Sequence, residues 1–299
     1  MSLEVDICGI KFKNPVIAAS GTFGFGREFS AYIDLNRLGG IASKGLTLHK
    51  NLGNKGLRIY ETASGLMNSI GLQNPGIAYF VKEELPFLLA KDTVTIANLG
   101  GHSIDEYVRG AEILDQTDLK IIELNISCPN VKEGGMAFGT DPSKAKEVIT
   151  KVREKTNKVL MVKLSPNVGH IGDFAKIAQD CGADCISLIN TVNAMAIDIR
   201  KRKAVFANKT AGLSGPCIKP IALRMVNEAA NSVSIPVIGM GGIMTYEDAI
   251  EFIMAGAKAV QVGSANFVDY KAMINIIDGI EKFMDEEKIK DLSEITNII

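Results

Sequence analysis

Residues able to bind or react recur directly after short apolar runs along this sequence. The runs end in Ser20-Gly21, Ser43-Lys44-Gly45, Asn98, Asn125-Ile126-Ser127-Cys128, Lys163, Asn190-Thr191, Gly241-Gly242 and Gly263-Ser264. Amide, hydroxyl and ammonium groups hydrogen-bond carboxylates and ring carbonyls, whereas backbone N–H groups in glycine-rich turns bind phosphate. These residue types predict one pocket for an anionic ligand that is held by hydrogen bonds.

Cys128 is the candidate reactive group among them. It lies in the segment NISCPN, where Asn125, Ser127 and Asn130 surround it and Pro129 follows it. A polar loop suits a reactive thiol, but no histidine is close in sequence to form a Cys-His nucleophile pair. The thiol is therefore a candidate general base, with a structural loop cysteine as the alternative.

Two lysines end apolar runs. A buried ammonium is costly without an anion, so Lys44 and Lys163 either meet a bound anion or are ordinary surface lysines. A lysine at the end of a barrel strand can also form a Schiff base, which keeps an aldolase-type lyase open for Lys163.

Two glycine pairs, Gly241-Gly242 and Gly263-Ser264, end the last two runs. Barrels commonly bind a phosphate at the ends of strands seven and eight, so the pairs together favour a phosphorylated ligand. The segment GTFGFG lacks the third glycine of the dinucleotide fingerprint. A nicotinamide site is therefore not expected on this chain.

Eight strands are needed to position these residues. The runs are PVIAAS from 15, GGIASKG from 39, DTVTIANLG from 92, KIIELNIS from 120, KVLMVKLS from 158, CISLINT from 185, IPVIGMGG from 235 and AVQVGS from 259. Most connections have helical periodicity, with helix starts predicted at Ser103, Asp141 and Thr245. Eightfold alternation of strand and helix favours a closed parallel (β/α)8 TIM barrel over an open sheet, with the active site at the C-terminal ends of the strands.

Two connections, 46–91 and 192–217, are longer than simple crossovers and are expected to carry function. The second contains Arg200-Lys201-Arg202-Lys203, which forms either a solvated loop tip or a basic rim for an anion or a partner. No linker is evident, so we expect one domain over residues 1–299.

Composition limits the class of protein. The 299 residues include 33 basic and 34 acidic side chains, giving a net charge of −1 that does not call for nucleic acid or an anionic membrane. Neither a signal peptide nor an apolar window of 18 residues is evident, so we expect a cytoplasmic protein. The cysteines are odd in number and unevenly spaced, which argues against a disulfide framework. Cys181 and Cys185 are expected in the core, and no metal is assigned.

At these residues the sequence resembles the dihydroorotate dehydrogenase family over essentially its whole length. The matching segments are AASGTFGFG, SKGLT, MNSIGLQNPG, LNISCPNVKEGG, VKLSPN, LINT, GLSGP, GMGGI and VQVGSANF. Within the family, the cysteine together with YETASGLMNSIGLQNPG, FGTDP and GLSGPCIKPIALRMV looks like the NAD-linked class 1B. These segments look less like the fumarate-using soluble class. The membrane-associated class is similar in the barrel but carries an N-terminal extension and a serine base.

The resemblance implies a reaction and its residues. (S)-dihydroorotate is oxidised to orotate, a step of pyrimidine biosynthesis, with Cys128 as the base for the C5 proton and FMN as acceptor of the C6 hydride. Substrate binding is implied for Lys44, Asn68, Ser69, Ile70, Gly71, Leu72, Asn125, Asn190 and Thr191. FMN binding is implied for Ser20, Lys44, Gly45, Asn98, Asn125, Lys163, Ile189, Gly215, Gly241, Gly242, Gly263 and Ser264.

The resemblance also implies a partner. In class 1B, a second subunit with FAD and a [2Fe–2S] cluster passes electrons to NAD, around a homodimer of the catalytic chain within a heterotetramer. This sequence has neither a four-cysteine cluster spacing nor a full dinucleotide fingerprint, which agrees with such a division. Alternatives are a fumarate-using dihydroorotate dehydrogenase, the Schiff-base lyase and a silent phosphate-binding scaffold.

Overall fold

A closed parallel barrel forms the centre of the computed structural model, which describes residues 2–127 and 135–299. Its strands follow the order β10-β15-β16-β3-β4-β7-β8-β9. They are β3 (Val16–Ala18), β4 (Gly40–Ala42), β7 (Val94–Leu99), β8 (Ile121–Asn125), β9 (Val159–Lys163), β10 (Cys185–Leu188), β15 (Val237–Met240) and β16 (Ala259–Val262). Each lies within one of the eight predicted runs, so the predicted TIM barrel is confirmed.

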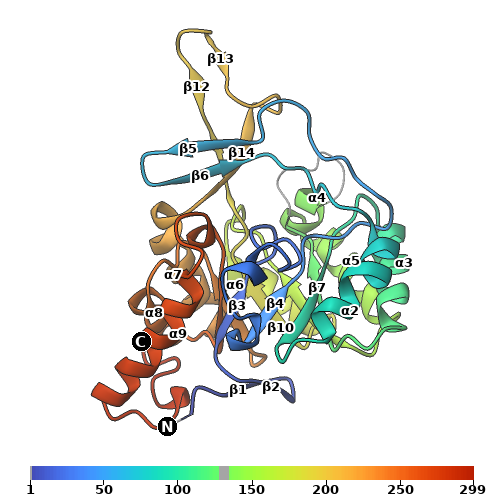
Figure 1. Ribbon diagram of the computed structural model, residues 1–299. Coiled ribbons are helices and arrows are strands. Elements are labelled where there is room, and N and C mark those ends of the chain that lie inside the picture. Colours follow the sequence, from blue (N-terminus) through green and yellow to red (C-terminus); the bar gives the residue numbers. More distant parts are fainter. Residues whose placement is uncertain (1, 128–134) are drawn as a thin grey trace.

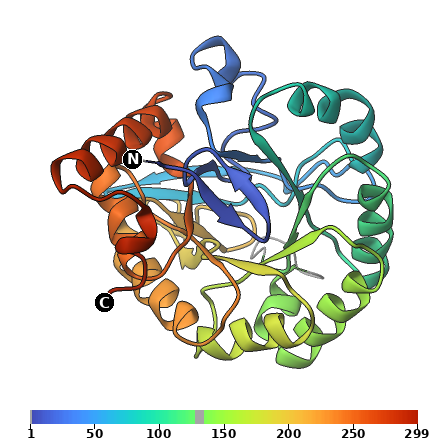
Figure 2. The same cartoon turned by 90° about the horizontal axis from the view of Figure 1, so that it is seen from below.

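Helices surround the barrel, as the view along its axis shows (Figure 2). They are α1 (Ile77–Tyr79), a π-helical turn (Phe80–Glu84), α2 (Leu85–Leu89), α3 (Ile104–Asp115), α4 (Gly135–Thr140), α5 (Pro142–Arg153), α6 (Ile171–Asp180), α7 (Lys219–Ala230), α8 (Tyr246–Met254) and α9 (Ala272–Glu286). Between β3 and β4 the described chain has only the 3-10 turns Phe29–Ala31 and Leu35–Arg37.

The three predicted helix starts are confirmed by their capping bonds. The side chain of Ser103 accepts from Glu106 N, and that of Asp141 accepts from the N–H groups of Ser143 and Lys144. Thr245 forms a reciprocal capping box with Asp248. Such caps satisfy backbone N–H groups that have no partner within the helix, which fixes where each helix begins.

An N-terminal hairpin closes the bottom of the barrel (Figure 2). It consists of β1 (Val5–Ile7) and β2 (Ile10–Phe12). Ile7 and Phe12 are fully buried and belong to one apolar cluster with Met161 and Cys185 from the barrel strands. The predicted core position of Cys185 is confirmed, and Cys181 caps the C-terminus of α6 in a partly buried position.

A four-stranded antiparallel sheet stands above the opposite end of the barrel (Figure 1). Its strands, in the order β11-β14-β6-β5, are β11 (Val192–Met195), β14 (Thr210–Ser214), β6 (Gly65–Asn68) and β5 (Ile59–Thr62). Both long connections of the sequence supply strands to it. A small hairpin of β12 (Ile197–Asp198) and β13 (Lys203–Ala204) extends farther outward.

The basic residues 200–203 lie at this outer hairpin, and all four side chains are exposed. Asp198 accepts from the backbone N–H groups of Arg200 and Lys201 and pairs with the Lys201 ammonium at 3.1 Å. The segment is thus exposed at the tip of a hairpin, which both alternatives require, and its role as a basic rim for an anion or a partner stays a prediction. Within the described residues, no helix combines the length and the apolar character needed to cross a bilayer.

Candidate active site

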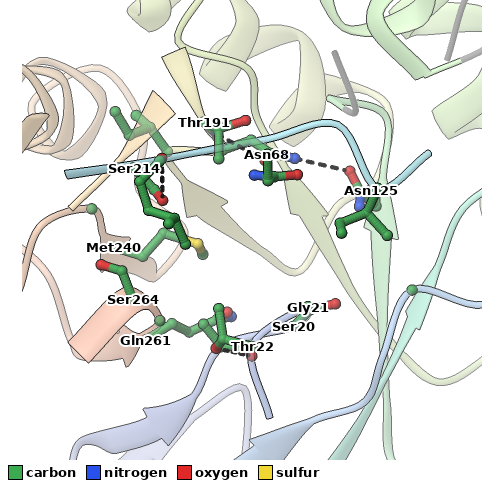
Figure 3. A pocket seen from close by; sticks show the side chains of 18 of the residues that line it. Ser20, Gly21, Thr22, Asn68, Asn125, Thr191, Ser214, Met240, Gln261 and Ser264 are labelled. Atoms are coloured by element: carbon green, nitrogen blue, oxygen red, sulfur yellow. Dashed lines mark hydrogen bonds between the residues drawn. The ribbon is translucent and has the colours of Figure 1, made fainter. Parts of the chain in front are cut away.

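A cavity of about 270 Å³ lies at the mouth of the barrel, between the C-terminal strand ends and the four-stranded sheet. Most predicted site residues line it. They are Ser20, Lys44, Gly45, Asn68, Ile70, Gly71, Leu72, Asn125, Lys163, Ile189, Asn190, Thr191, Gly241, Gly242, Gly263 and Ser264. Figure 3 shows Asn68, Thr191 and Ser214 on one side of this pocket, and Ser20, Thr22, Gln261 and Ser264 across from them.

Three predicted residues are described but do not line the cavity, and a fourth lies outside the described residues. Asn98 is fully buried behind the lining, and Gly215 packs beneath the glycine end of β15. The Ser69 hydroxyl accepts from Asn54 Nδ2 at 3.1 Å in a buried position away from the cavity. Cys128 lies outside the described residues.

Several lining residues were not predicted from the sequence. They are Ala19, Thr22, Ile59, Leu66, Gln73, Ser214, Ile218, Met240, Gln261 and Phe267. Gly21, which ends the first predicted run, lines the cavity as well. Gln261 could have been recognised from the sequence, because it lies two residues before Gly263 in the predicted run AVQVGS, and alternate residues of a strand point to the same side. Ile59, Leu66 and Ser214 reach the cavity from the antiparallel sheet, whose pairing no local pattern indicated.

Amide side chains form a hydrogen-bonded group at one side of the cavity. Asn125 Nδ2 donates to Asn98 Oδ1 at 3.3 Å, and Asn125 Oδ1 accepts from the Ser127 hydroxyl at 3.0 Å. Asn190 Nδ2 donates to Ser127 Oγ at 2.8 Å and to Asn125 Oδ1 at 3.4 Å. The ends of β7, β8 and β10 are thereby joined through side chains.

Two lysines bring positive charge to the pocket. Burial lowers the pKa of Lys44, against the opposing effect of Glu28, with a further lowering by Arg58. Lys163 is only 5% exposed. Within residues 2–127 and 135–299 neither ammonium forms an ion pair, so both are available to an anion.

Glycines shape the end of the pocket at the last two strands. A Cβ on Gly242, which has φ +76°, would lie 2.7 Å from Gly215 O and 2.9 Å from Lys219 N at the start of α7. Gly263 is different, because the nearest atom to its Cβ would be 3.6 Å away. Backbone therefore approaches backbone closely at the end of β15, whereas a Cβ at the end of β16 would make only ordinary van der Waals contacts with Ala19 and Thr22.

The family model for dihydroorotate dehydrogenase matches residues 2–284 of this chain. The chain belongs to the dihydroorotate dehydrogenase family. A protein of Petrotoga mobilis named dihydroorotate dehydrogenase B (NAD(+)), catalytic subunit, is 61% identical over 99% of both chains. Proteins with the same name from Thermoanaerobacter pseudethanolicus and Geotalea uraniireducens are 55% and 53% identical, over 98–99% of this chain and 98% and 96% of their own lengths.

The residues that line the cavity belong to the sequence segments that resemble the family. The cavity of this dihydroorotate dehydrogenase family member is lined by residues of the segments that carried the resemblance, including Lys44 of SKGLT, Lys163 of VKLSPN and Asn190 of LINT. Segments from every quarter of the sequence thus meet at one barrel mouth.

Proposed function

We propose that this chain is the FMN-binding catalytic subunit of an NAD-linked dihydroorotate dehydrogenase that converts (S)-dihydroorotate to orotate. The observation that carries the proposal is the ring of strand-end lysine, amide and glycine residues around one cavity in a chain of this family. Amides can pair with the carboxylate, carbonyl and N–H groups of the substrate ring, and the lysines offer charge for its carboxylate or for the cofactor.

FMN suits the residues around the cavity. Gly241, Gly242, Gly263 and Ser264 all line the cavity, and Gly242 lies beside Lys219 at the N-terminus of α7. Backbone N–H groups of such strand ends and helix N-termini bind phosphate in barrels. Gln261 is 1% exposed, and its Oε1 has no hydrogen-bond partner in the described structure. A buried polar atom without a partner is costly, which supports a polar group or ordered water in the complete site.

The chain's own residues bind and deprotonate the substrate in this proposal. Asn68, Asn125, Asn190 and Thr191 hold the ring, and the Cys128 thiolate removes the proton from C5. FMN, when bound, supplies the acceptor for the hydride that leaves C6. Lys163, which lines the cavity, would help to hold FMN and would supply positive charge that favours its reduced form. The C5 proton ends on the Cys128 sulfur and the C6 hydrogen leaves with its electron pair to the acceptor that FMN would supply, so atoms and electrons balance when orotate is released.

A partner subunit completes the electron path in the proposal. The relatives are named as catalytic subunits of an NAD(+) enzyme, which supports a separate partner subunit. We propose that this partner carries FAD and a [2Fe–2S] cluster. We propose a homodimer of this chain within a heterotetramer and a location in the cytoplasm. One FMN-binding domain spans residues 1–299 in this proposal.

The test begins with the purified chain, alone and with its co-purifying partner. We expect bound FMN, bleaching of the flavin by dihydroorotate, reduction of artificial dyes by the chain alone, and NAD reduction only with the partner. Fumarate reduction by the isolated chain would instead support the fumarate-using enzyme. A colourless protein that borohydride links to its substrate through Lys163 would support the lyase.

A further inference from the structure

A carboxylate lies inside the barrel below the lining of the cavity. Glu123 on β8 is fully buried, and no role in the proposed reaction has been given to it. Its oxygens accept from Ser187 Oγ at 2.8 Å, from Gln261 Nε2 at 2.7 Å and from Asn98 Nδ2. Three further strands, β10, β16 and β7, thus each send a donor to one interior carboxylate.

The carboxylate gives the neighbouring hydrogen bonds a direction. An ionised carboxylate only accepts, whereas an asparagine amide donates through Nδ2 and accepts through Oδ1. Asn98 therefore turns its Nδ2 toward Glu123 and its Oδ1 toward Asn125. That oxygen requires a donor, so Asn125 turns its own Nδ2 toward Asn98.

The same direction continues to the cavity. Asn125 Oδ1 faces Ser127 and Asn190, and Asn190 directs its Nδ2 to Asn125 and Ser127. Asn190 Oδ1 accepts from the backbone N–H of Thr191 at 2.8 Å and keeps a second lone pair. In this row of hydrogen-bonded amides, the Nδ2 group of each asparagine donates to the next residue on the side of Glu123. The Oδ1 atom of Asn190 is therefore left to accept a hydrogen bond from a ligand.

We propose that Glu123 is a positioning residue that fixes the orientation of the Asn98, Asn125 and Asn190 amides and so determines which ligand groups Asn190 can meet. Resting on the proposed function, this means that Asn190 Oδ1 selects a ring N–H of the substrate. Without an obligate acceptor at position 123, each amide can turn over and present the wrong group. Glu123 itself touches no ligand, because it lies below the cavity and does not line it.

The test uses the FMN-loaded chain and measures orotate binding by the change it causes in the flavin absorption spectrum. Glu123→Gln has nearly the same shape but can donate as well as accept, so the direction is no longer enforced. We expect its orotate Kd to rise about 10-fold or more, since hydrogen bonds to charged groups are the stronger ones. Glu123→Asp keeps an obligate acceptor and should bind orotate more tightly than Glu123→Gln.

Thr95→Val is the matched control. Thr95 is buried on β7, as Asn98 is, and its hydroxyl has no partner among the described residues. Its replacement removes an interior polar atom without touching the chain of amides, so orotate should bind as in the wild type. Thermal unfolding of each loaded variant separates a loss of binding from a loss of fold.

Asn98→Ala provides a second test if Glu123→Gln does not fold. It breaks the link between Glu123 and Asn125 while the carboxylate keeps two donors, and it should weaken orotate binding similarly. Wild-type orotate affinity in folded, FMN-loaded Glu123→Gln or Asn98→Ala would overturn the positioning role. Failure of the wild-type chain to bind orotate would instead contradict the proposed function.

Discussion

Asn190 Nδ2 donates to Ser127 Oγ across 2.8 Å, which ties the end of β10 to the residue directly before Cys128. Ser127 is itself fully buried and bonded to Asn125. The proposed base is therefore attached to the same hydrogen-bonded group that is proposed to hold the substrate. A substitution of the thiol alone leaves this group in place.

Cys128→Ser should slow flavin reduction by dihydroorotate by about 10² to 10⁴, because loss of a positioned base typically costs that much. FMN and orotate should still bind, since Asn125, Ser127 and Asn190 are unchanged. In the wild type the rate should rise with pH until the thiol is ionised, near pH 8.5 if its pKa is that of a free cysteine. Stopped-flow bleaching from pH 6 to 10 measures both effects, and Cys181→Ser at the C-cap of α6 is the control. Equal rates in Cys128→Ser and the wild type would remove Cys128 from the mechanism.

Gly263→Ala should weaken FMN binding without unfolding the protein. The nearest protein atom to the added methyl group would be 3.6 Å away, so the protein itself accommodates the group. Gly263 lines the cavity, however, so the methyl group would compete with the cofactor for space. We expect the FMN Kd to rise about 10-fold or more and the melting temperature of the FMN-free protein to stay unchanged. Gly169→Ala is the matched control, because a Cβ there has open space and Gly169 does not line the cavity. Equal FMN affinity in both variants would place the phosphate elsewhere.

FMN affinity should fall as the pH rises into the alkaline range. Burial holds the pKa of the free Lys44 ammonium below its ordinary value of 10.5, and a bound anion raises it again. Binding therefore takes up a proton between these two pKa values, and affinity decreases with pH across that window. Lys44→Gln should bind FMN more weakly at pH 7 and lose this part of the pH dependence. Fluorescence titrations from pH 7 to 10 test this, with the exposed Lys176→Gln as control. An unchanged pH profile in Lys44→Gln would contradict it.

Asp248 should contribute to stability above about pH 4 and lose that contribution in acid. Burial raises its pKa, but hydrogen bonds from the Lys219 ammonium and from the backbone N–H groups of Met244 and Thr245 outweigh burial and lower the pKa. A carboxyl with a lowered pKa in the folded state stabilises above its unfolded value, and the effect disappears as the pH falls through the lower folded value.

Asp248→Asn should therefore cost about 1 kcal/mol of unfolding free energy at pH 7, the usual size of a lost capping interaction. The difference from wild type should shrink at pH 3. Urea unfolding at both pH values measures it. Glu281→Gln on the exposed face of α9 is the control and should change little. A cost for Asp248→Asn that is the same at pH 3 as at pH 7 would rule out this account.

The sequence alone determined the barrel, because strand and helix periodicities are local and caps such as Thr245 with Asp248 lie within one helical turn. It also placed Lys44, Lys163 and Asn190 together, since the C-terminal ends of parallel barrel strands meet at one mouth. Sequence could further have revealed Glu123, which precedes Asn125 by two residues and so shares its face of the strand.

Tertiary structure decided what depends on partners distant in the chain. Asn68 of β6 is in register with Gly212 of β14, 144 residues away, so the sheet above the mouth has no local signal. Ser69 belongs to a predicted substrate segment, yet its hydroxyl meets Asn54 because that antiparallel pairing fixes which side chains turn inward. The direction of the amide chain from Glu123 to Asn190 also needed the fold, since each bond joins a different strand end and an amide's orientation follows only from its neighbours.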